Sequence, residues 1–204
     1  MHPSKIVCIG TNYRLHAEEM GKGIPEEPLL FLKPPSSVIG NGEAIHRPAG
    51  YDRVDFEGEL GVVIGQRVHG VAREHALSVI AGYVCVNDVT VRDLQKKDVQ
   101  FTRAKGFDTF CPIGPRVVSG LDPTNLKIVT RVNGKVRQDS TTADMIFDVA
   151  TLVAFCSRFM TLEAGDVLST GTPSGVGNLV PGDVVEVEIE GIGILRNPVI
   201  AEPT

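Results

Sequence analysis

The sequence has no long hydrophobic run, no paired-cysteine motif and no excess of basic charge, and each absence narrows the class of protein. No stretch approaches the about 20 apolar residues that cross a bilayer, and the N-terminal residues form no apolar signal segment. The net charge is −5 and the basic residues are scattered, which argues against a nucleic-acid surface or an anionic membrane surface. We therefore expect neither a nucleic-acid partner nor a membrane partner.

The cysteines lie far apart among apolar neighbours, and none of them forms a CxxC motif. Cysteines of this kind behave as small hydrophobic side chains in a reducing compartment. We therefore expect a cytoplasmic protein in which four thiols are buried and unbonded, those of Cys8, Cys85, Cys111 and Cys156.

At 204 residues the chain has the size of one domain, and we expect a single domain over residues 1–204. Hydrophobic residues make up 42% and charged residues 22%, which is ordinary for a globular protein. The 22 glycines and 13 prolines divide the apolar residues into short segments, and this favours strands over helices. The sequence predicts a β-rich α+β fold with strands at 5–9, 60–65, 83–87, 115–118, 126–132, 167–170, 184–190 and 194–199.

Helical periodicity and turn signals are found in a few segments. Apolar residues recur at helical spacing over 72–80 and over 149–160, where Asp148 can cap the first turn. Asn133-Gly134, between two alternating segments, predicts a tight hairpin.

Residues 11–27 differ from the rest of the chain. Tyr13 to Met20 can form a short helix, but Gly21, Gly23 and Pro25 follow and interrupt it. We expect this segment to be a hinged lid rather than part of the core.

Two glutamates, Glu57 and Glu59, flank one glycine just before the apolar run 61–64. Side chains alternate along a strand, so the two carboxylates point to the same face and repel each other unless a cation lies between them. Asp88 ends another apolar run, where a charge is costly unless it is paired or metal-bound. Three carboxylates suit Mg²⁺, Mn²⁺ or Ca²⁺ better than Zn²⁺. A second interpretation stays open at this point, in which the glutamates are solvent-facing charges on an edge strand.

Five motifs occur in a fixed order along the chain, and together they resemble the fumarylacetoacetate hydrolase family. The motifs are NYRLHAEE at 12–19, DFEGEL at 55–60, the segment 82–93, KGFDTF at 105–110 and TGTPSGVG at 170–177. The resemblance extends from Ile6 to about Pro198 and is to the short members, which consist of the catalytic domain alone. It implies a mixed β-roll or barrel with few short helices, and a homodimer.

The resemblance also implies a metal site and a base. Glu57, Glu59 and Asp88 would ligate Mg²⁺ or Mn²⁺, which would chelate the pyruvate-like head of a 2-oxo acid and stabilise its enolate. His16 and Glu19 match the lid pair of the family and, being three residues apart, can touch on one helical face. Glu19 would orient the imidazole, and His16 would deprotonate a water molecule. Without the resemblance, His16 would be interpreted as an exposed histidine on a mobile segment.

Four further residues match family positions. Lys105 resembles the active-site lysine, which can hold an oxyanion or a carboxylate. Thr172 matches the substrate loop, whereas Gln95 and Lys33 match substrate-binding positions less specifically; solvated polar side chains are the alternative for each. We expect Arg92 and Asp93 to form a structural ion pair.

The family supports several reactions on one metal–enolate platform. The leading hypothesis is hydrolysis of a C–C bond in an acylpyruvate-type 2,4-dioxo acid, with oxaloacetate decarboxylation as a possible second activity. The alternative is a 2-hydroxyhepta-2,4-diene-1,7-dioate isomerase or decarboxylase of aromatic catabolism, and a further one is a metal-binding module without catalysis. Arg14 and Arg103 flank the motifs and could bind a second carboxylate, or could simply be exposed.

Overall fold

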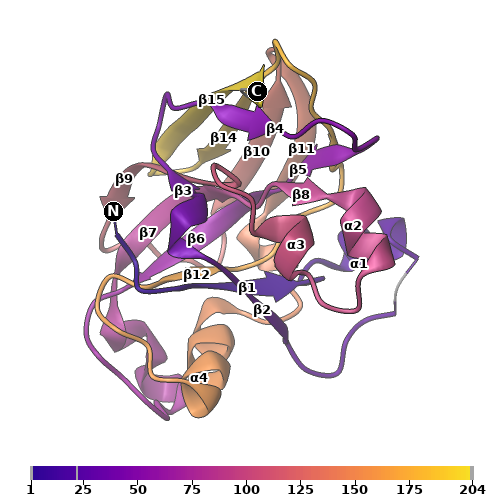
Figure 1. Cartoon of the computed structure of the whole chain (residues 1–204). Coiled ribbons are helices and arrows are strands. Elements are labelled where there is room, and N and C mark those ends of the chain that lie inside the picture. Colours follow the sequence, from indigo (N-terminus) through magenta and orange to yellow (C-terminus); the bar gives the residue numbers. More distant parts are fainter. Residues whose placement is uncertain (1, 22, 203–204) are drawn as a thin grey trace.

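Within residues 2–21 and 23–202, which the computed structural model describes, the strands form three sheets (Figure 1). The largest sheet has seven strands in the order β2-β1-β12-β6-β7-β9-β3. Their bounds are Leu29–Lys33 (β2), Ile6–Gly10 (β1), Val167–Ser169 (β12), Gly58–Ile64 (β6), Ile80–Asn87 (β7), Cys111–Val118 (β9) and Val38–Ile39 (β3).

The second sheet has five strands in the order β11-β10-β14-β15-β4, and the third has the order β13-β5-β8. Their bounds are Lys135–Thr141 (β11), Lys127–Val132 (β10), Val184–Ile189 (β14), Gly193–Ala201 (β15), Ile45–Arg47 (β4), Gly177–Asn178 (β13), Val54–Phe56 (β5) and Thr90–Val91 (β8). The helices are short: Arg14–Glu19 (α1), Arg92–Lys97 (α2), Thr102–Lys105 (α3), Val149–Phe159 (α4) and the 3-10 helices Pro35–Ser37 (η1), Arg73–Val79 (η2) and Thr142–Asp144 (η3).

All eight predicted strands are present, with shifted ends. The hairpin prediction is confirmed: β10 and β11 pair with Val132 opposite Lys135, and the two residues between them have positive φ angles of 52° (Asn133) and 74° (Gly134). These angles match the two-residue turn that Asn-Gly favours, because its twist agrees with the twist of the strands. The hairpin places β11 at one edge of the five-stranded sheet.

The helix predictions hold for two of three segments. The α4 helix begins after Asp148, whose side chain accepts a hydrogen bond from Thr151 N, and its buried side includes Leu152 and Val153. The α1 helix lies within the expected lid. The prediction over 72–80 is wrong in type: η2 is a 3-10 helix without a side-chain cap. Its buried residues Ala76 and Val79 are three apart, the spacing at which side chains line up along a 3-10 helix, whereas Leu77, which an α-helical apolar face would include, is exposed.

The core lies between the sheets and beneath α4. One cluster joins Leu60 and Val62 of β6 to Leu152 of α4 and Val187 of β14. The β6 strand is buried along its whole length, as its near-continuous apolar sequence favours. All four cysteines are buried and free, which confirms that prediction.

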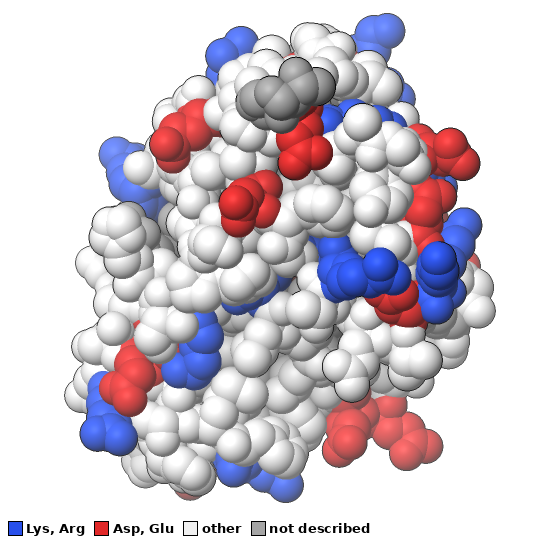
Figure 2. All heavy atoms as spheres, in the orientation of Figure 1, with Lys and Arg blue, Asp and Glu red and all other residues white. Residues whose placement is uncertain are grey.

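The predicted fold class is confirmed, because the chain is mostly strands with a few short helices (Figure 1). On the face shown in Figure 2, Lys and Arg side chains are interspersed with Asp and Glu rather than gathered in one patch. None of the described helices combines the length and the apolar character that a membrane-spanning helix needs.

Candidate metal and substrate site

The three predicted carboxylates converge at one end of β6. Glu57 follows β5, Glu59 is the second residue of β6, and Asp88 follows β7. Because β6 and β7 pair antiparallel with Gly58 opposite Asn87, the end of β7 lies beside the start of β6. One oxygen from each carboxylate lies within 4.8 Å of the others, and the residues are 4%, 1% and 1% exposed. We call Glu57, Glu59 and Asp88 the acidic triad.

Three buried cations contact two members of the acidic triad. Lys105 Nζ donates to Glu57 Oε2 (2.9 Å) and to Asp88 Oδ2. Arg92 Nη2 donates to Glu57 Oε1 (2.5 Å), and Lys33 Nζ donates to Asp88 Oδ1 (2.7 Å). Burial disfavours the charged form of Glu57, but Lys105 and Arg92 outweigh it and hold the pKa of Glu57 below its ordinary value. Burial opposes the charge of Lys105 as well, but Asp88 and Glu57 raise its pKa.

Glu59 has a different environment. Its Oε2 accepts hydrogen bonds from Ser169 Oγ (2.5 Å) and Gly171 N (2.8 Å), and no described residue donates a hydrogen bond to Oε1. Burial, and then the charges of Asp88 and Glu57, raise the pKa of Glu59 well above its ordinary value. Among the described residues, no Lys or Arg forms an ion pair with Glu59, in contrast to Glu57 and Asp88.

The donor set of the acidic triad fits a hard divalent cation. Such a cation takes oxygen ligands, and carboxylates are its preferred protein donors. It would also supply the positive charge that Glu59 lacks, and so favour the ionised carboxylate. The residues present are therefore suited to hold Mg²⁺ or Mn²⁺.

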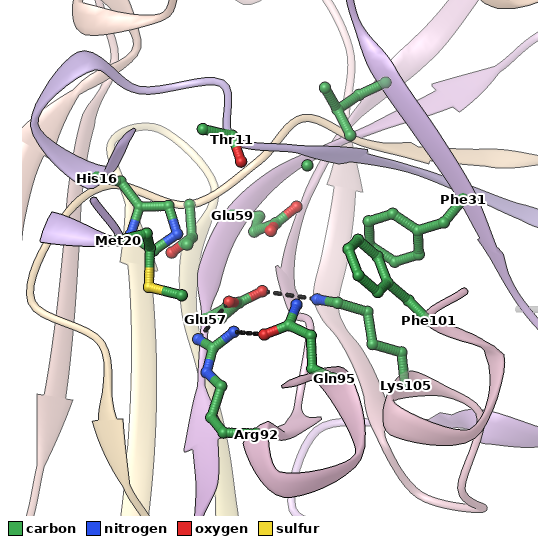
Figure 3. A pocket seen from close by; sticks show the side chains of 13 residues that line it. Thr11, His16, Met20, Phe31, Glu57, Glu59, Arg92, Gln95, Phe101 and Lys105 are labelled. Atoms are coloured by element: carbon green, nitrogen blue, oxygen red, sulfur yellow. Dashed lines mark hydrogen bonds and ion pairs between the residues drawn. The ribbon is translucent and has the colours of Figure 1, made fainter. Parts of the chain in front are cut away.

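A cavity of about 20 Å³ lies beside the acidic triad. A volume of this size holds about one water-sized group. Figure 3 shows Glu57 and Glu59 at the centre, Phe31 and Phe101 to one side, and His16 with Met20 to the other. The lining residues are Ile9, Gly10, Thr11, His16, Met20, Phe31, Glu57, Glu59, Arg92, Gln95, Phe101, Lys105 and Thr172.

The α1 helix covers this cavity. His16 is 5% exposed, and its Nδ1 lies 2.9 Å from Glu19 Oε2, so the predicted pair is in contact. The other Glu19 oxygen accepts from Gly175 N (3.0 Å), which joins the helix to the glycine-rich segment 170–177. The expected lid over 11–27 includes position 22, which lies outside the described residues.

The remaining predicted site residues fall into two groups. Gln95 and Thr172 line the cavity, and Gln95 Oε1 accepts from Arg92 Nη1 (2.7 Å). Lys33 is 1% exposed and lies behind Asp88, where its Nζ also donates to Val89 O (3.1 Å). Because Lys33 is not among the residues that line the cavity, its contact with a substrate stays a prediction.

The predicted Arg92–Asp93 ion pair is wrong. Arg92 bonds to Asp55 and Glu57, and it lines the cavity. Adjacent helical residues point in different directions, and Asp93 instead accepts from the backbone N–H of Arg53 (3.0 Å).

The sequence therefore did not identify Arg92 as a residue of the cavity, and it offered Arg14 and Arg103 as candidates for binding a second carboxylate. Arg14 and Arg103 are exposed, neither lines the cavity, and Arg103 pairs with Asp98. Sequence reasoning also missed Ser169, which bonds to Glu59, and the aromatic wall of Phe31 and Phe101. The motif at 82–93 was the one available signal for Arg92, and the sequence carries no signal for the roles of Ser169, Phe31 and Phe101.

Comparison with known proteins gives consistent results. The family model described as fumarylacetoacetate (FAA) hydrolase C-terminal matches residues 5–200. The chain is 46% identical over 212 residues to oxaloacetate tautomerase YisK of Bacillus subtilis, covering 97% of this chain and 70% of that protein. The crystal structure of 5-carboxymethyl-2-hydroxymuconate delta-isomerase from Mycobacterium smegmatis matches with a TM-score of 0.94 at 48% identity, covering 100% of this chain and 81% of that one. That of 2-hydroxyhepta-2,4-diene-1,7-dioate isomerase from Mycobacterium marinum matches with a TM-score of 0.93 at 46% identity, covering 100% and 77%.

Proposed function

The chain belongs to the fumarylacetoacetate hydrolase family, and from that premise we propose that it is a divalent-metal-dependent enzyme that interconverts the enol and keto forms of a small 2-oxo dicarboxylic acid such as oxaloacetate. The observation that carries the proposal is the buried acidic triad, two members of which, Glu57 and Glu59, line one small cavity together with His16 and Arg92. The three similar proteins support the reaction type, since their names describe a tautomerase and two isomerases.

Glu57, Glu59 and Asp88 are the residues that would hold the metal. The chemistry that Mg²⁺ or Mn²⁺ supplies when bound is Lewis-acid stabilisation of negative charge on oxygen. The three carboxylates are held in place by Lys105, Arg92, Lys33 and Ser169, so little reorganisation is needed.

His16 is the residue suited to move the proton. The Glu19 carboxylate can only accept, so His16 Nδ1 carries a hydrogen and the lone pair of the neutral ring lies on Nε2. We assign Nε2 to take the proton from the carbon next to the 2-oxo group and to return it to the oxygen of the resulting enolate, which gives the enol form. In the reverse direction Nε2 takes the hydroxyl proton of the enol and returns it to that carbon. The α1 helix, which covers the cavity, and the apolar side chains of Phe31, Phe101 and Met20 exclude water from this proton transfer.

The His16–Glu19 pair also favours a second candidate function, the hydrolysis of an acylpyruvate. In that reaction the same Nε2 would take a proton from a water molecule that attacks the acyl carbon. We rank the tautomerase first because it needs no attacking water molecule, and because the similar proteins are named as a tautomerase and two isomerases rather than as hydrolases.

A substrate comparison separates these functions. The purified protein is loaded with Mg²⁺ and given the enol form of oxaloacetate, whose ultraviolet absorbance falls as the keto form appears; acetylpyruvate cleavage and carbon dioxide release from oxaloacetate are followed in parallel. We expect metal-dependent ketonisation faster than the buffer reaction, and its loss when Glu57 and Glu59 are both replaced by Ala. Acetylpyruvate cleavage without any effect on the enol would identify a hydrolase and overturn the proposal.

A further inference from the structure

Gln138 is a buried polar residue in an otherwise exposed edge strand. It is 1% exposed, whereas its neighbours Arg137 and Asp139 are exposed. Its amide would be costly to bury unless each polar atom had a partner. The partners of its side chain are Gly58, which lies between Glu57 and Glu59, and two residues of the segment 170–177.

A β-bulge turns Gln138 toward that site. In the pairing of β10 with β11, Thr130 lies opposite Gln138 and Arg131 opposite Val136, so Arg137 is an extra residue. A bulge of this kind breaks the alternation of side chains and redirects the residue that follows it. It therefore directs the Gln138 side chain inward from a strand that otherwise faces solvent.

The Gln138 amide bridges two segments of the site. Its Oε1 accepts from Gly58 N (3.0 Å), and Gly58 lies between the ligands Glu57 and Glu59. Its Nε2 donates to Thr172 Oγ1 (2.7 Å) and to Pro173 O (2.7 Å), and so uses both of its hydrogens. These partners fix the orientation of the amide, because a flipped amide would place its oxygen against a carbonyl oxygen.

The hydroxyl of Thr172 forms hydrogen bonds within the same network. It accepts from Gln138 and donates to Gly58 O (2.9 Å), so its single hydrogen already has an acceptor. Both backbone groups of Gly58 are thus held, one by Gln138 and the other by Thr172. A Cβ added at Gly58 would lie 2.1 Å from Thr130 Oγ1, which shows how closely these segments meet.

The substrate loop also contacts the bulge directly. Gly175 has a φ of 99°, and a Cβ there would lie 2.1 Å from Arg137 O. A position with positive φ and no space for a side chain favours glycine strongly. The loop 170–177 is therefore held against the bulge of β11.

We propose that Gln138 is a positioning residue that sets the loop carrying Thr172 at a fixed distance from the metal-ligand segment Glu57–Glu59, so that one 2-oxo acid head can bind both. The inference rests on the proposed function, since it assumes that a 2-oxo acid head is the ligand. Gln138 touches neither cavity nor substrate and acts through Thr172 and Gly58. The carboxylates of the acidic triad have hydrogen-bond partners other than Gln138 and keep them when Gln138 is replaced. Gln138 therefore governs the binding of the organic ligand rather than of the metal.

The test compares two affinities in the full chain. Mn²⁺ binding, and then oxalate binding to the Mg²⁺-loaded protein, are measured by calorimetry, with oxalate as the probe of the 2-oxo acid head. In Gln138→Met, which keeps the side-chain volume and loses all three hydrogen bonds, we expect oxalate binding to weaken about tenfold or more and Mn²⁺ binding to stay within about threefold. Gln138→Glu keeps the acceptor toward Gly58, loses the paired donors, and is the second variant if Gln138→Met does not fold.

A double-mutant cycle identifies the route of the effect. Thr172→Val should weaken oxalate binding in the same way, and the double variant with Gln138→Met should be no weaker than the weaker single variant, because both remove one network. Arg137→Ala is the matched control on the same strand, and it should bind oxalate as the wild type does.

Three outcomes would count against the inference. Unchanged oxalate affinity in Gln138→Met overturns it, as does an equal loss of Mn²⁺ and oxalate affinity, which would indicate general structural damage. If the wild type binds Mg²⁺ but not oxalate, the proposed function is wrong, and the inference about Gln138 falls with it.

Discussion

The hydrogen-bond capacity of each buried side chain decides what that residue can do in the cavity. Lys105 has three N–H donors, and Glu57, Asp88 and Thr90 each accept one of them. Contact between Lys105 and a substrate oxyanion therefore requires the exchange of an existing hydrogen bond. In this arrangement Lys105 first balances the charge of the acidic triad, and its predicted contact with substrate stays a prediction.

At the residue scale, the role of His16 can be tested by substitution. In His16→Ala we expect the rate of enol ketonisation with Mg²⁺ to fall by about 10² to 10⁴, the range that positioned acid–base groups contribute. Oxalate affinity should change little, because the acidic triad does not depend on the imidazole. Glu19→Gln should lower the rate less, since the amide can still accept from Nδ1 but no longer stabilises the charged ring. Stopped-flow absorbance and calorimetry measure the two quantities.

His75→Ala provides the control for this prediction. His75 is exposed, and its side chain has no hydrogen-bond partner among the described residues, so the variant should keep the wild-type rate. An unchanged rate in His16→Ala would remove His16 from the mechanism. A parallel loss of oxalate binding would instead make it a ligand-binding residue.

The sequence was informative about this site where function depends on local spacing. Glu57 and Glu59 share a face because strand geometry has a period of two, and His16 and Glu19 meet because they are three apart on a helix. Gln138 could not be foreseen, because its inward direction comes from a bulge in strand pairing that no local signal in the sequence marks.

At the element scale, Asp166 joins two segments that are distant in sequence. Its Oδ1 accepts from Ser4 N (3.0 Å), Ser4 Oγ (2.6 Å) and Lys5 N (3.2 Å), and its Oδ2 accepts from Glu163 N (2.8 Å) and from Lys5 Nζ. These bonds hold the start of β1 beside the turn that leads into β12, with which β1 pairs in parallel. Burial opposes the charge, but the hydrogen bonds from Lys5, Ser4 and Glu163 outweigh it and lower the pKa of Asp166.

Asp166→Asn should therefore destabilise the protein in a pH-dependent way. We expect the free energy of unfolding to fall by about 2 kcal/mol at pH 7, because several hydrogen bonds to a charged group are weakened or lost. With a lowered pKa, the stabilisation by Asp166 is complete above the pKa of unfolded aspartate, about 3.9, and is lost as the pH falls through the lower pKa of the folded protein. Urea unfolding at several pH values measures this, and the wild type and variant should converge in acid.

The control for Asp166 is an exposed carboxylate in the same turn. Glu163 pairs with Arg67, and their side chains are 42% and 74% exposed, so Glu163→Gln should change the free energy of unfolding by less than about 0.5 kcal/mol. A difference between Asp166→Asn and the wild type that persists unchanged in acid would show that the charge of Asp166 is not what stabilises this turn.

Elements with strong local signals were predictable and short ones were not. The β10–β11 hairpin follows from Asn133-Gly134, and α4 follows from its apolar periodicity and the Asp148 cap. The β2 strand, which pairs with β1, has no alternation of apolar and polar residues in its sequence, and its burial does not alternate either, since Leu29 and Leu32 are exposed. Lys33 ends that strand, so its position behind Asp88 depends on a pairing that the sequence does not specify.

At the scale of the whole molecule, the site draws on nearly the entire chain. The acidic triad comes from the ends of β5 and β7 and from β6, the helix over the cavity is α1, and the bonds to Glu59 come from Ser169 at the end of β12 and from Gly171 after it. Such a site exists only in the folded protein, so metal binding and folding are linked. The three carboxylates repel one another when no cation balances Glu59. The carboxylate of Glu59, which the metal site needs, therefore lowers the stability of the metal-free protein.

Glu59→Gln tests that opposition, because it keeps the shape of the side chain and removes its charge. Without metal, the variant should unfold at the same temperature as the wild type or higher, since a buried charge without a cation partner is costly. At a Mg²⁺ concentration about 100 times Kd, the wild type should gain about 2.7 kcal/mol, or roughly 5–10 °C in Tm for a chain of this size, whereas the variant should gain little. The order of the two Tm values would then reverse between chelator and Mg²⁺ in scanning calorimetry. Glu163→Gln should follow the wild type in both conditions, and a Glu59→Gln variant that gains as much from Mg²⁺ as the wild type would exclude Glu59 as a ligand.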